Sequence, residues 1–286
     1  MRERHLPLVP TRTPRRARYG GVALAATALL LLASTQPAPV VAQSGTAAAV
    51  AAQSAEPALP FGIGERLTYS ARVSRFGRVG EAVMWIEGPD DVRGTSTYDL
   101  RFDFRARVGV LKAEDRTESW LDPRRMTALQ FQKHERHPLS RHDERVDMYP
   151  DERRWQAANG ETGQSPSDAP LDELSFMYFI RTLPLTRDTV FEFNRHFDAA
   201  RNPTTVRVVR REDVTTAAGE FHTVLVEMRV HDPRRYRGEG VISINLSDDD
   251  RRIPVRIVSS MPVIGTATLS LESHVGSPGQ LMAHAF

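Results

Sequence analysis

The stretch YDLRFDFRARV, residues 98–108, decides the fold class of this 286-residue chain. Every second residue in it is apolar, and every residue between them is charged. A β-strand projects successive side chains to opposite faces, so this pattern produces one apolar and one charged face. A helix would scatter the same charges around its circumference. The stretch therefore predicts a strand that lies with one face on a core.

The same alternation recurs in both directions along the chain, and turn-forming residues separate the repeats. Short strands joined by turns favour an antiparallel sheet. We expect a mainly β protein, with a curved antiparallel sheet or a barrel or sandwich of about ten or more strands. The other predicted strands cover residues 67–73, 79–87, 116–121, 127–133, 144–149, 190–197, 205–211, 221–231, 240–246, 253–259 and 263–271. Residues 88–91 (GPDD) are predicted to form a turn.

One segment, residues 171–183 (LDELSFMYFIRTL), is apolar on nearly every side. Pro170 suits the first position of a helix, Asp172 and Glu173 favour its N-terminal end, and Pro184 prevents its continuation. Because a helix that is apolar all round is buried, we expect one helix at about 171–183, packed inside the curve of the sheet. The side chains it would bury are Leu174, Phe176, Met177, Phe179, Ile180 and Leu183.

The first 42 residues are typical of an export signal. Four arginines between residues 12 and 18 precede a 12-residue apolar run at residues 22–33, which is within the 7–15 of a signal core. The run is shorter than the roughly 20 residues of a membrane span. We expect cleavage after Ala42; the alternative is a signal retained as an anchor.

Beyond the signal, composition divides the chain further. Residues 43–60 are rich in Ala, Ser, Gln and Pro, which predicts a flexible linker. A single β-rich domain is expected at residues 61–275 and a disordered tail at 276–286. We therefore predict a periplasmic or secreted protein with no membrane span after signal cleavage.

The net charge of the whole chain differs in sign from the net charge of the part that would remain after signal cleavage. The whole chain carries +2, but residues 1–42 contribute six arginines and one acid, and removing that +5 leaves −3. No basic stripe interleaved with aromatic residues is present, so we expect no nucleic-acid partner. The absence of cysteine excludes disulfides and thiolate metal sites.

Three groups of residues resemble one bacterial family, the domain of unknown function 3108. The start of the domain has the pattern G-E-x-L-x-Y, the predicted helix has D-x-x-S-x-x-Y-x-x-R, and a later hairpin has S-x-D-x-x-R-x-P-V. Where the family often has an aromatic residue before the last serine, this chain has Leu246. The resemblance covers roughly residues 61–273. The matching residues are Gly64, Glu65, Leu67, Tyr69, Asp172, Ser175, Tyr178, Arg181, Ser247, Asp249, Arg252, Pro254 and Val255.

What the resemblance implies is an exported, mostly β protein of the cell envelope. It implies no reaction, because the family has no established one. A further likeness, to half-barrel carriers of lipoproteins, is an analogy of fold alone.

Candidate ligand-binding residues lie on the predicted helix and beside it. Ser175, Tyr178 and Arg181 share one side of that helix and would orient a ligand head group, or else form an internal network with Asp172 and strand backbone. Phe193 and Arg195 would line a cavity if the sheet curves around a space, and would otherwise belong to the core. Phe191 and Phe197 are predicted to share one strand face with them.

Two clusters suit metal ions at first sight. His134, His137 and His142 with Glu144 would suit zinc, but their spacing matches no standard pattern, and strand residues 134 and 137 would point to opposite faces. We interpret this cluster as a polar hairpin loop between strands 127–133 and 144–149. The run of aspartates at 248–250 would suit calcium, but is interpreted as a turn paired with Arg251 or Arg252. We therefore predict no metal and no cofactor.

Three functional hypotheses remain. The first is a non-enzymatic envelope protein that binds a lipid-like or amphipathic molecule or a partner protein. The second is a hydrolase acting on envelope glycan or lipid, with acids such as Glu118 and Asp122, or Glu227 beside Arg229, inside the same concavity. The third is a structural assembly factor. Because the chain has neither a G-x-S-x-G motif nor a cysteine, we assign no catalytic residue, and whether it is an enzyme is left open.

Overall fold

The computed structural model describes residues 59–231, 239–261 and 265–277. The expected signal peptide, nearly all of the expected linker and the expected tail beyond Ser277 lie outside the described residues. Within the described ranges, no helix is long and apolar enough to cross a membrane.

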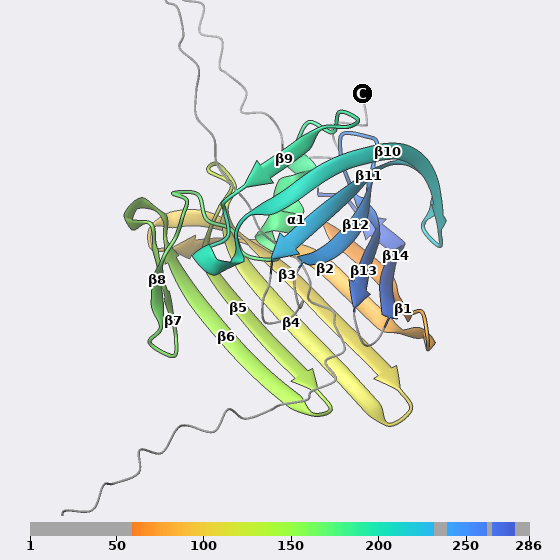
Figure 1. Cartoon of the computed structure of the whole chain (residues 1–286), viewed down its shortest axis with the longest axis horizontal. Helices are drawn as coiled ribbons and strands as arrows, with labels where there is room; N and C mark the ends of the chain where they lie inside the picture. Colours follow the sequence, from red (N-terminus) through yellow and green to blue (C-terminus); the bar gives the residue numbers. More distant parts are fainter. Residues whose placement is uncertain (1–58, 232–238, 262–264, 278–286) are drawn as a thin grey trace, which may run out of the picture.

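A single antiparallel sheet of fourteen strands makes up most of the described protein (Figure 1). The strands are β1 (Arg66–Val73), β2 (Gly77–Val92), β3 (Thr95–Val108), β4 (Leu111–Asp122), β5 (Thr127–His137), β6 (Ser140–Tyr149), β7 (Arg154–Ala157), β8 (Thr162–Gln164), β9 (Val190–Phe193), β10 (Thr204–Thr216), β11 (Gly219–His231), β12 (Glu239–Ser247), β13 (Pro254–Met261) and β14 (Gly265–Val275). The short helices are η1 (Pro150–Glu152), α1 (Ser175–Phe179), η2 (Ile180–Thr182) and η3 (Ala199–Arg201). The predicted fold class, a curved antiparallel sheet with one buried helix, is confirmed.

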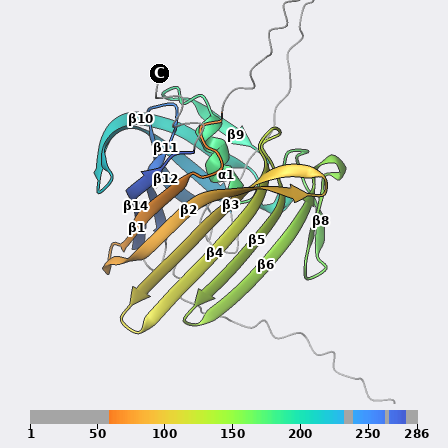
Figure 2. The same cartoon turned by 180° about the vertical axis from the view of Figure 1, so that it is seen from behind.

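The topology consists of two meanders joined through the first and last strands. Strands β1 to β8 pair in sequence, β9 to β14 pair in sequence, and β1 pairs with β14. The edges of the sheet are therefore β8 and β9, which are neighbours in the sequence. The chain that connects these two edges carries α1, and Figures 1 and 2 show this helix inside the curve of the sheet. We call the face turned toward α1 the inner face.

The strand predicted from residues 98–108 lies within β3, and its alternation is confirmed by burial. Its apolar side chains Leu100, Phe102 and Phe104 are buried in the main core. On the opposite face the charges pair with one another, and the Arg101 guanidinium lies 2.6 Å from Asp99 and 3.3 Å from Glu87. The charged half of the pattern thus becomes a set of salt bridges on the outer face.

The buried helix is present but shorter than predicted. Pro170 and Leu171 lie outside the helix, and their backbone groups bond to distant parts of the chain. Pro170 O accepts from Ala128 N on β5 at 2.9 Å, and Leu171 N donates to Arg195 O, just beyond β9, at 2.6 Å, in an isolated bridge with His196. Helical turns begin only after Asp172, whose Oδ1 accepts the amide hydrogens of Leu174 and Ser175. Tertiary hydrogen bonds therefore override the local helix preference of these two residues and keep them out of the helix.

Five of the six side chains that were predicted to be buried on this segment are buried in the structure. Between Leu174 and Ile180 every residue is buried, and the aromatic and aliphatic side chains belong to the main core. Leu183 is only partly buried, since the chain has already left the helix for an extended conformation there.

Three local predictions were wrong. Residues 88–91 form no turn; β2 runs through them with an irregularity between Glu87 and Asp90, and the reversal comes at Arg93 and Gly94, which both have positive φ. The histidine-rich segment is strand rather than loop, because β5 and β6 pair as far as His137 and Ser140. The strand predicted at 190–197 ends at Phe193, so Phe197 lies outside it and packs against Phe131 and Trp155.

Candidate functional site

The predicted polar stripe on the helix begins with Arg181, whose side chain is fully buried. Its guanidinium forms two 2.7 Å hydrogen bonds with the carboxylate of Glu65, just before β1. It also donates to the carbonyls of Pro60 at 2.7 Å and Arg251 at 2.9 Å. Arg181 thus joins the helix to the start of the sheet and to the turn before β13.

Ser175 belongs to a second buried network, around Asp172. The hydroxyls of Ser119 on β4 and Ser175 donate to Asp172 Oδ2 at 2.6 and 2.9 Å. Burial raises the pKa of Asp172 to about 6, and these hydrogen bonds only partly counteract it. The network ties the first turn of the helix to β4.

The other predicted residues also gather around α1. The hydroxyl of Tyr178 is buried without a hydrogen-bond partner in the described part of the chain. Phe193 packs edge-on against Phe179, with ring centroids 5.0 Å apart. Arg195 lies 4.4 Å over the ring of Phe179 and donates to the carbonyls of Ala169 and Met126. The five predicted residues are therefore brought together, although the charged groups of Arg181 and Arg195 already have protein partners; their role in ligand binding stays a prediction.

The raised pKa of Asp172 predicts a specific pH dependence of stability. The folded protein holds the proton of this carboxyl between about pH 4 and pH 6, whereas the unfolded chain has lost it. Its contribution to stability is therefore present below the unfolded pKa and is lost as pH rises through the folded pKa. Asp172→Asn keeps the acceptor for the two amides but cannot titrate. Relative to wild type, its free energy of unfolding should rise by roughly 3 kcal/mol between about pH 4 and pH 7 in urea denaturation. Parallel profiles for the two proteins would contradict this.

A second polar region lies on the inner face, on strands β4 to β6. Two rows of side chains cross these strands, because Thr117 pairs with Lys133 and Asp115 pairs with Glu135, and β6 continues each row. We call this region the polar wall. Its residues are Thr117, Lys133 and Glu144 in one row and Asp115, Glu135 and His142 in the other.

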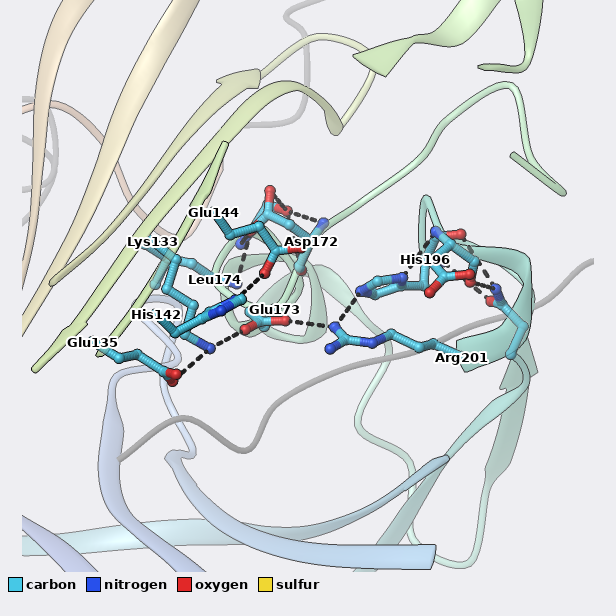
Figure 3. Close-up of polar contacts among 12 residues, drawn as sticks. Lys133, Glu135, His142, Glu144, Asp172, Glu173, Leu174, His196 and Arg201 are labelled. Atoms are coloured by element: carbon cyan, nitrogen blue, oxygen red, sulfur yellow. Dashed lines mark hydrogen bonds and ion pairs between the residues drawn. The ribbon is translucent and has the colours of Figure 1, made fainter. Parts of the chain in front are cut away.

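Charges of alternating sign connect the polar wall to the segment before α1 (Figure 3). Lys133 Nζ lies 2.5 Å from Glu173 Oε1 and 3.2 Å from Glu135 Oε1. Glu173 Oε2 accepts from Arg201 Nη1 at 3.0 Å. Beside Arg201, burial lowers the pKa of His196 well below its usual value, so this imidazole is neutral. The buried charges compensate one another along the series.

Two buried polar atoms of the polar wall lack partners. One oxygen of Asp115 lies 2.7 Å from His137 Nε2, while burial raises the pKa of its carboxyl. The other oxygen, and the hydroxyl of Thr117 two residues along β4, have no hydrogen bond in the described protein. Because buried polar groups are nearly always paired, these two atoms could each accept or donate one further hydrogen bond.

The inner face changes character from one side to the other. On β1 to β3 its side chains are apolar, and they include Leu67, Tyr69, Met84, Phe102 and Phe104. Across β4 to β6 the side chains of the polar wall become progressively exposed, from 1% for Lys133 and 13% for Glu135 to 25% for Glu144 and 51% for His142. The arrangement suits a molecule with an apolar part and a polar head, approached from β6.

Sequence reasoning missed the polar wall. The available signal was β4, where residues 114–119 (EDRTES) are polar at every position, so that both faces of the strand carry polar side chains. The sequence places Glu173 only at the helix N-terminus, and nothing in it connects this residue to Lys133.

The histidines of the zinc hypothesis each have a different acidic partner. His134 Nδ1 lies 2.6 Å from Asp143 on the outer side, and His142 Nε2 lies 3.3 Å from Glu144. Among the described residues, no group of three or more potential ligands is placed to hold a metal ion. In the aspartate run, Asp249 accepts from the Ser247 hydroxyl and pairs with Arg251, as in the predicted turn.

Comparison with known proteins identifies the family of this chain and one solved structure with a similar fold. A family model described as "Protein of unknown function (DUF3108)" matches residues 66–272. In sequence, no curated protein matches the chain. A beta-barrel-like protein of domain of unknown function DUF1849 from Brucella abortus has a similar fold, with a TM-score of 0.51 and 13% identity over 77% of this chain and 100% of that chain.

Two other solved structures are more distant. An exported protein with a YmcC-like fold from Bacteroides fragilis has a TM-score of 0.29 and 12% identity, over 76% of this chain and 98% of that one. A lipoprotein from Parabacteroides distasonis has a TM-score of 0.31 and 10% identity, over 76% and 97%. Of the three likenesses, only the first bears on the fold of this chain.

Proposed function

We propose that this chain, which belongs to the DUF3108 family of proteins of unknown function, is an exported, non-enzymatic β scaffold that binds an amphipathic molecule on its inner face. The observation that carries the proposal is the division of that face into an apolar side on β1 to β3 and a polar wall on β4 to β6. A lipid-like molecule presents the same two halves.

The free polar atoms define the chemistry of the head group. The unpartnered oxygen of Asp115 is an acceptor when ionised, and the Thr117 hydroxyl both donates and accepts. The cations Lys133 and Arg201 are already paired with carboxylates. A head group that carries hydroxyl or amine donors therefore fits this wall better than an anion does.

Export is proposed on separate grounds. The basic segment, the apolar run at residues 22–33 and the small residues before position 43 support a cleaved signal. A location in the periplasm or outside the cell would bring the protein into contact with envelope lipids and envelope proteins, the classes of partner that we propose.

Thr117→Val separates ligand binding from folding, because valine has the shape of threonine but no hydroxyl. Removing an unsatisfied buried hydroxyl should raise the free energy of unfolding of the ligand-free protein by about 1 kcal/mol. Thr204→Val is the matched control, since the Thr204 hydroxyl is also buried and unpartnered but lies on β10. Both variants should be stabilised, and only Thr117→Val should lose bound ligand.

The measurement is native mass spectrometry, with lipid extraction, of protein purified gently from the envelope of its own cells. Wild type and Thr204→Val should carry the same small molecule, and Thr117→Val should carry several-fold less. Ligand-free wild-type protein, or equal occupancy in all three, would contradict the proposal.

The hydrolase hypothesis keeps one supporting observation, the raised pKa of Asp115 beside His137. If Asp115 acted as a general acid, purified protein should cleave envelope glycan or lipid, and Asp115→Asn should abolish the cleavage. If the wild-type protein binds such a molecule without cleaving it, the result favours the non-enzymatic scaffold.

A further inference from the structure

Three successive hairpins turn at the same end of the sheet (Figures 1 and 2). They join β1 to β2, β3 to β4 and β5 to β6, and strand register places their turns at neighbouring ends of adjacent strands. We call residues 74–78, 107–112 and 136–142 the hairpin tips. His142, the most exposed residue of the polar wall, belongs to the third tip, so the tips adjoin the open side of the inner face.

The charge of the hairpin tips is entirely positive. They contain six basic residues and no acid, whereas the rest of residues 43–286 then carries −9. Arg78 pairs with Glu272 and Arg136 with Asp143. The other four basic side chains, which make no ion pair with any described residue, are Arg75, Arg107, Lys112 and Arg141.

The hairpin tips also hold most of the large apolar side chains that the described protein exposes. Phe76 is 52% exposed, Val110 94%, Leu111 48% and Leu139 74%, so each of the three tips carries at least one. None of these four side chains belongs to a core cluster of the described protein. A group of exposed apolar residues surrounded by polar ones marks an interaction site.

A groove between the first two tips adds a place for a head group. It has a volume of about 390 Å³ and is open to solvent. Four cations and two acids line it, and Arg107 and Lys112 belong to the unpaired set: Arg78, Arg105, Arg107, Lys112, Glu81 and Glu114. A lipid phosphate in this groove would meet the unpaired cations.

We propose that the hairpin tips dock the protein on an anionic lipid surface. Apolar side chains that project from the turns enter the boundary between head groups and acyl chains, and the cations around them bind lipid phosphates. This orientation turns the exposed side of the polar wall toward the bilayer. Docking does not depend on what the inner face binds.

The contribution of the tip cations is tested by co-sedimentation of the protein with vesicles of equal parts phosphatidylglycerol and phosphatidylcholine. The protein is the exported full chain, and mass spectrometry establishes its N-terminus. Each basic residue near an anionic surface contributes about fivefold in affinity, so Arg107→Gln/Lys112→Gln should weaken binding roughly 30-fold. Arg153→Gln/Arg187→Gln, two exposed cations outside the tips, is the matched control and should bind as wild type. Wild-type binding should also weaken as salt increases.

Insertion of the apolar tip side chains into the lipid is tested with the double variant Val110→Ser/Leu111→Ser, which should bind the vesicles about tenfold or more weakly than wild type. The control is Val190→Ser, which changes an exposed apolar side chain on β9 and should bind as wild type does. All variants should keep the wild-type melting temperature, since the changed side chains are exposed. Equal binding by tip variants and controls, or equal binding to vesicles of phosphatidylcholine alone, would overturn the proposal. Concentration-dependent dimers in sedimentation that the tip variants abolish, without vesicle binding, would assign the tips to a second copy of the chain and overturn it as well.

Discussion

Arg181→Met should destabilise the protein by about 3–5 kcal/mol, because it leaves the carboxylate of Glu65 buried without a counter-charge. Both side chains are almost completely buried, with 0% and 2% of their surfaces exposed. The carbonyls of Pro60 and Arg251 would lose a donor at the same time. Urea denaturation of purified wild type and variant measures the loss.

A surface pair in the same protein provides the control. Arg78 and Glu272 also form two hydrogen bonds between a guanidinium and a carboxylate, but the Arg78 side chain is 55% exposed. Exposed pairs contribute at most about 1 kcal/mol, so Arg78→Met should have little effect. If Arg78→Met and Arg181→Met cost the same, burial would not be the cause.

The double variant Glu65→Leu/Arg181→Met tests the mechanism. Removing both charges ends the penalty of an unpaired buried carboxylate, so the double variant should be more stable than Arg181→Met alone by at least about 2 kcal/mol. Full recovery is not expected, because the two carbonyls still lack their donor. A double variant that is less stable than either single variant would contradict this account.

Phe176→Asp should abolish soluble expression. Phe176 is completely buried, and its ring packs 5.4 Å from Phe179 and 6.2 Å from Phe193, measured between centroids. Truncating such a ring to alanine typically costs 3–5 kcal/mol, and a buried unpaired carboxylate adds more. The total approaches the roughly 5–15 kcal/mol that stabilise a whole domain.

Phe76→Asp is the matched control, since Phe76 is 52% exposed at a hairpin tip. It should express and melt as wild type does, and its effect should be confined to lipid binding. Ile180→Asp places the charge one turn later on the same buried segment and should repeat the failure of Phe176→Asp. A soluble Phe176→Asp protein with the melting temperature of wild type would show that the helix is not part of the core.

The candidate site was predictable only in part, and particular residues show why. Ser175, Tyr178 and Arg181 were grouped correctly around the helix, because helical spacing alone brings residues three apart together. Their partners were not predictable from spacing: Glu65 lies 116 positions from Arg181, and Ser119 lies 53 from Asp172. The polar wall required the register of three strands and a salt bridge from Lys133 to Glu173, 40 positions apart.

The amino-acid sequence by itself determined what depends on neighbours in the chain. The alternation of β3 specified its two faces, and the apolar residues 174–180 specified a buried segment, because both patterns repeat over a few residues. Only the tertiary structure decided where the helix begins, since Ala128 N on β5 donates to Pro170 O and Leu171 N donates to Arg195 O, which keeps both residues outside the helix. It also decided that Lys133, Glu173 and Arg201 meet and that three basic tips share one end of the sheet. These contacts join residues far apart in the chain, and their geometry follows from strand pairing rather than from local preference.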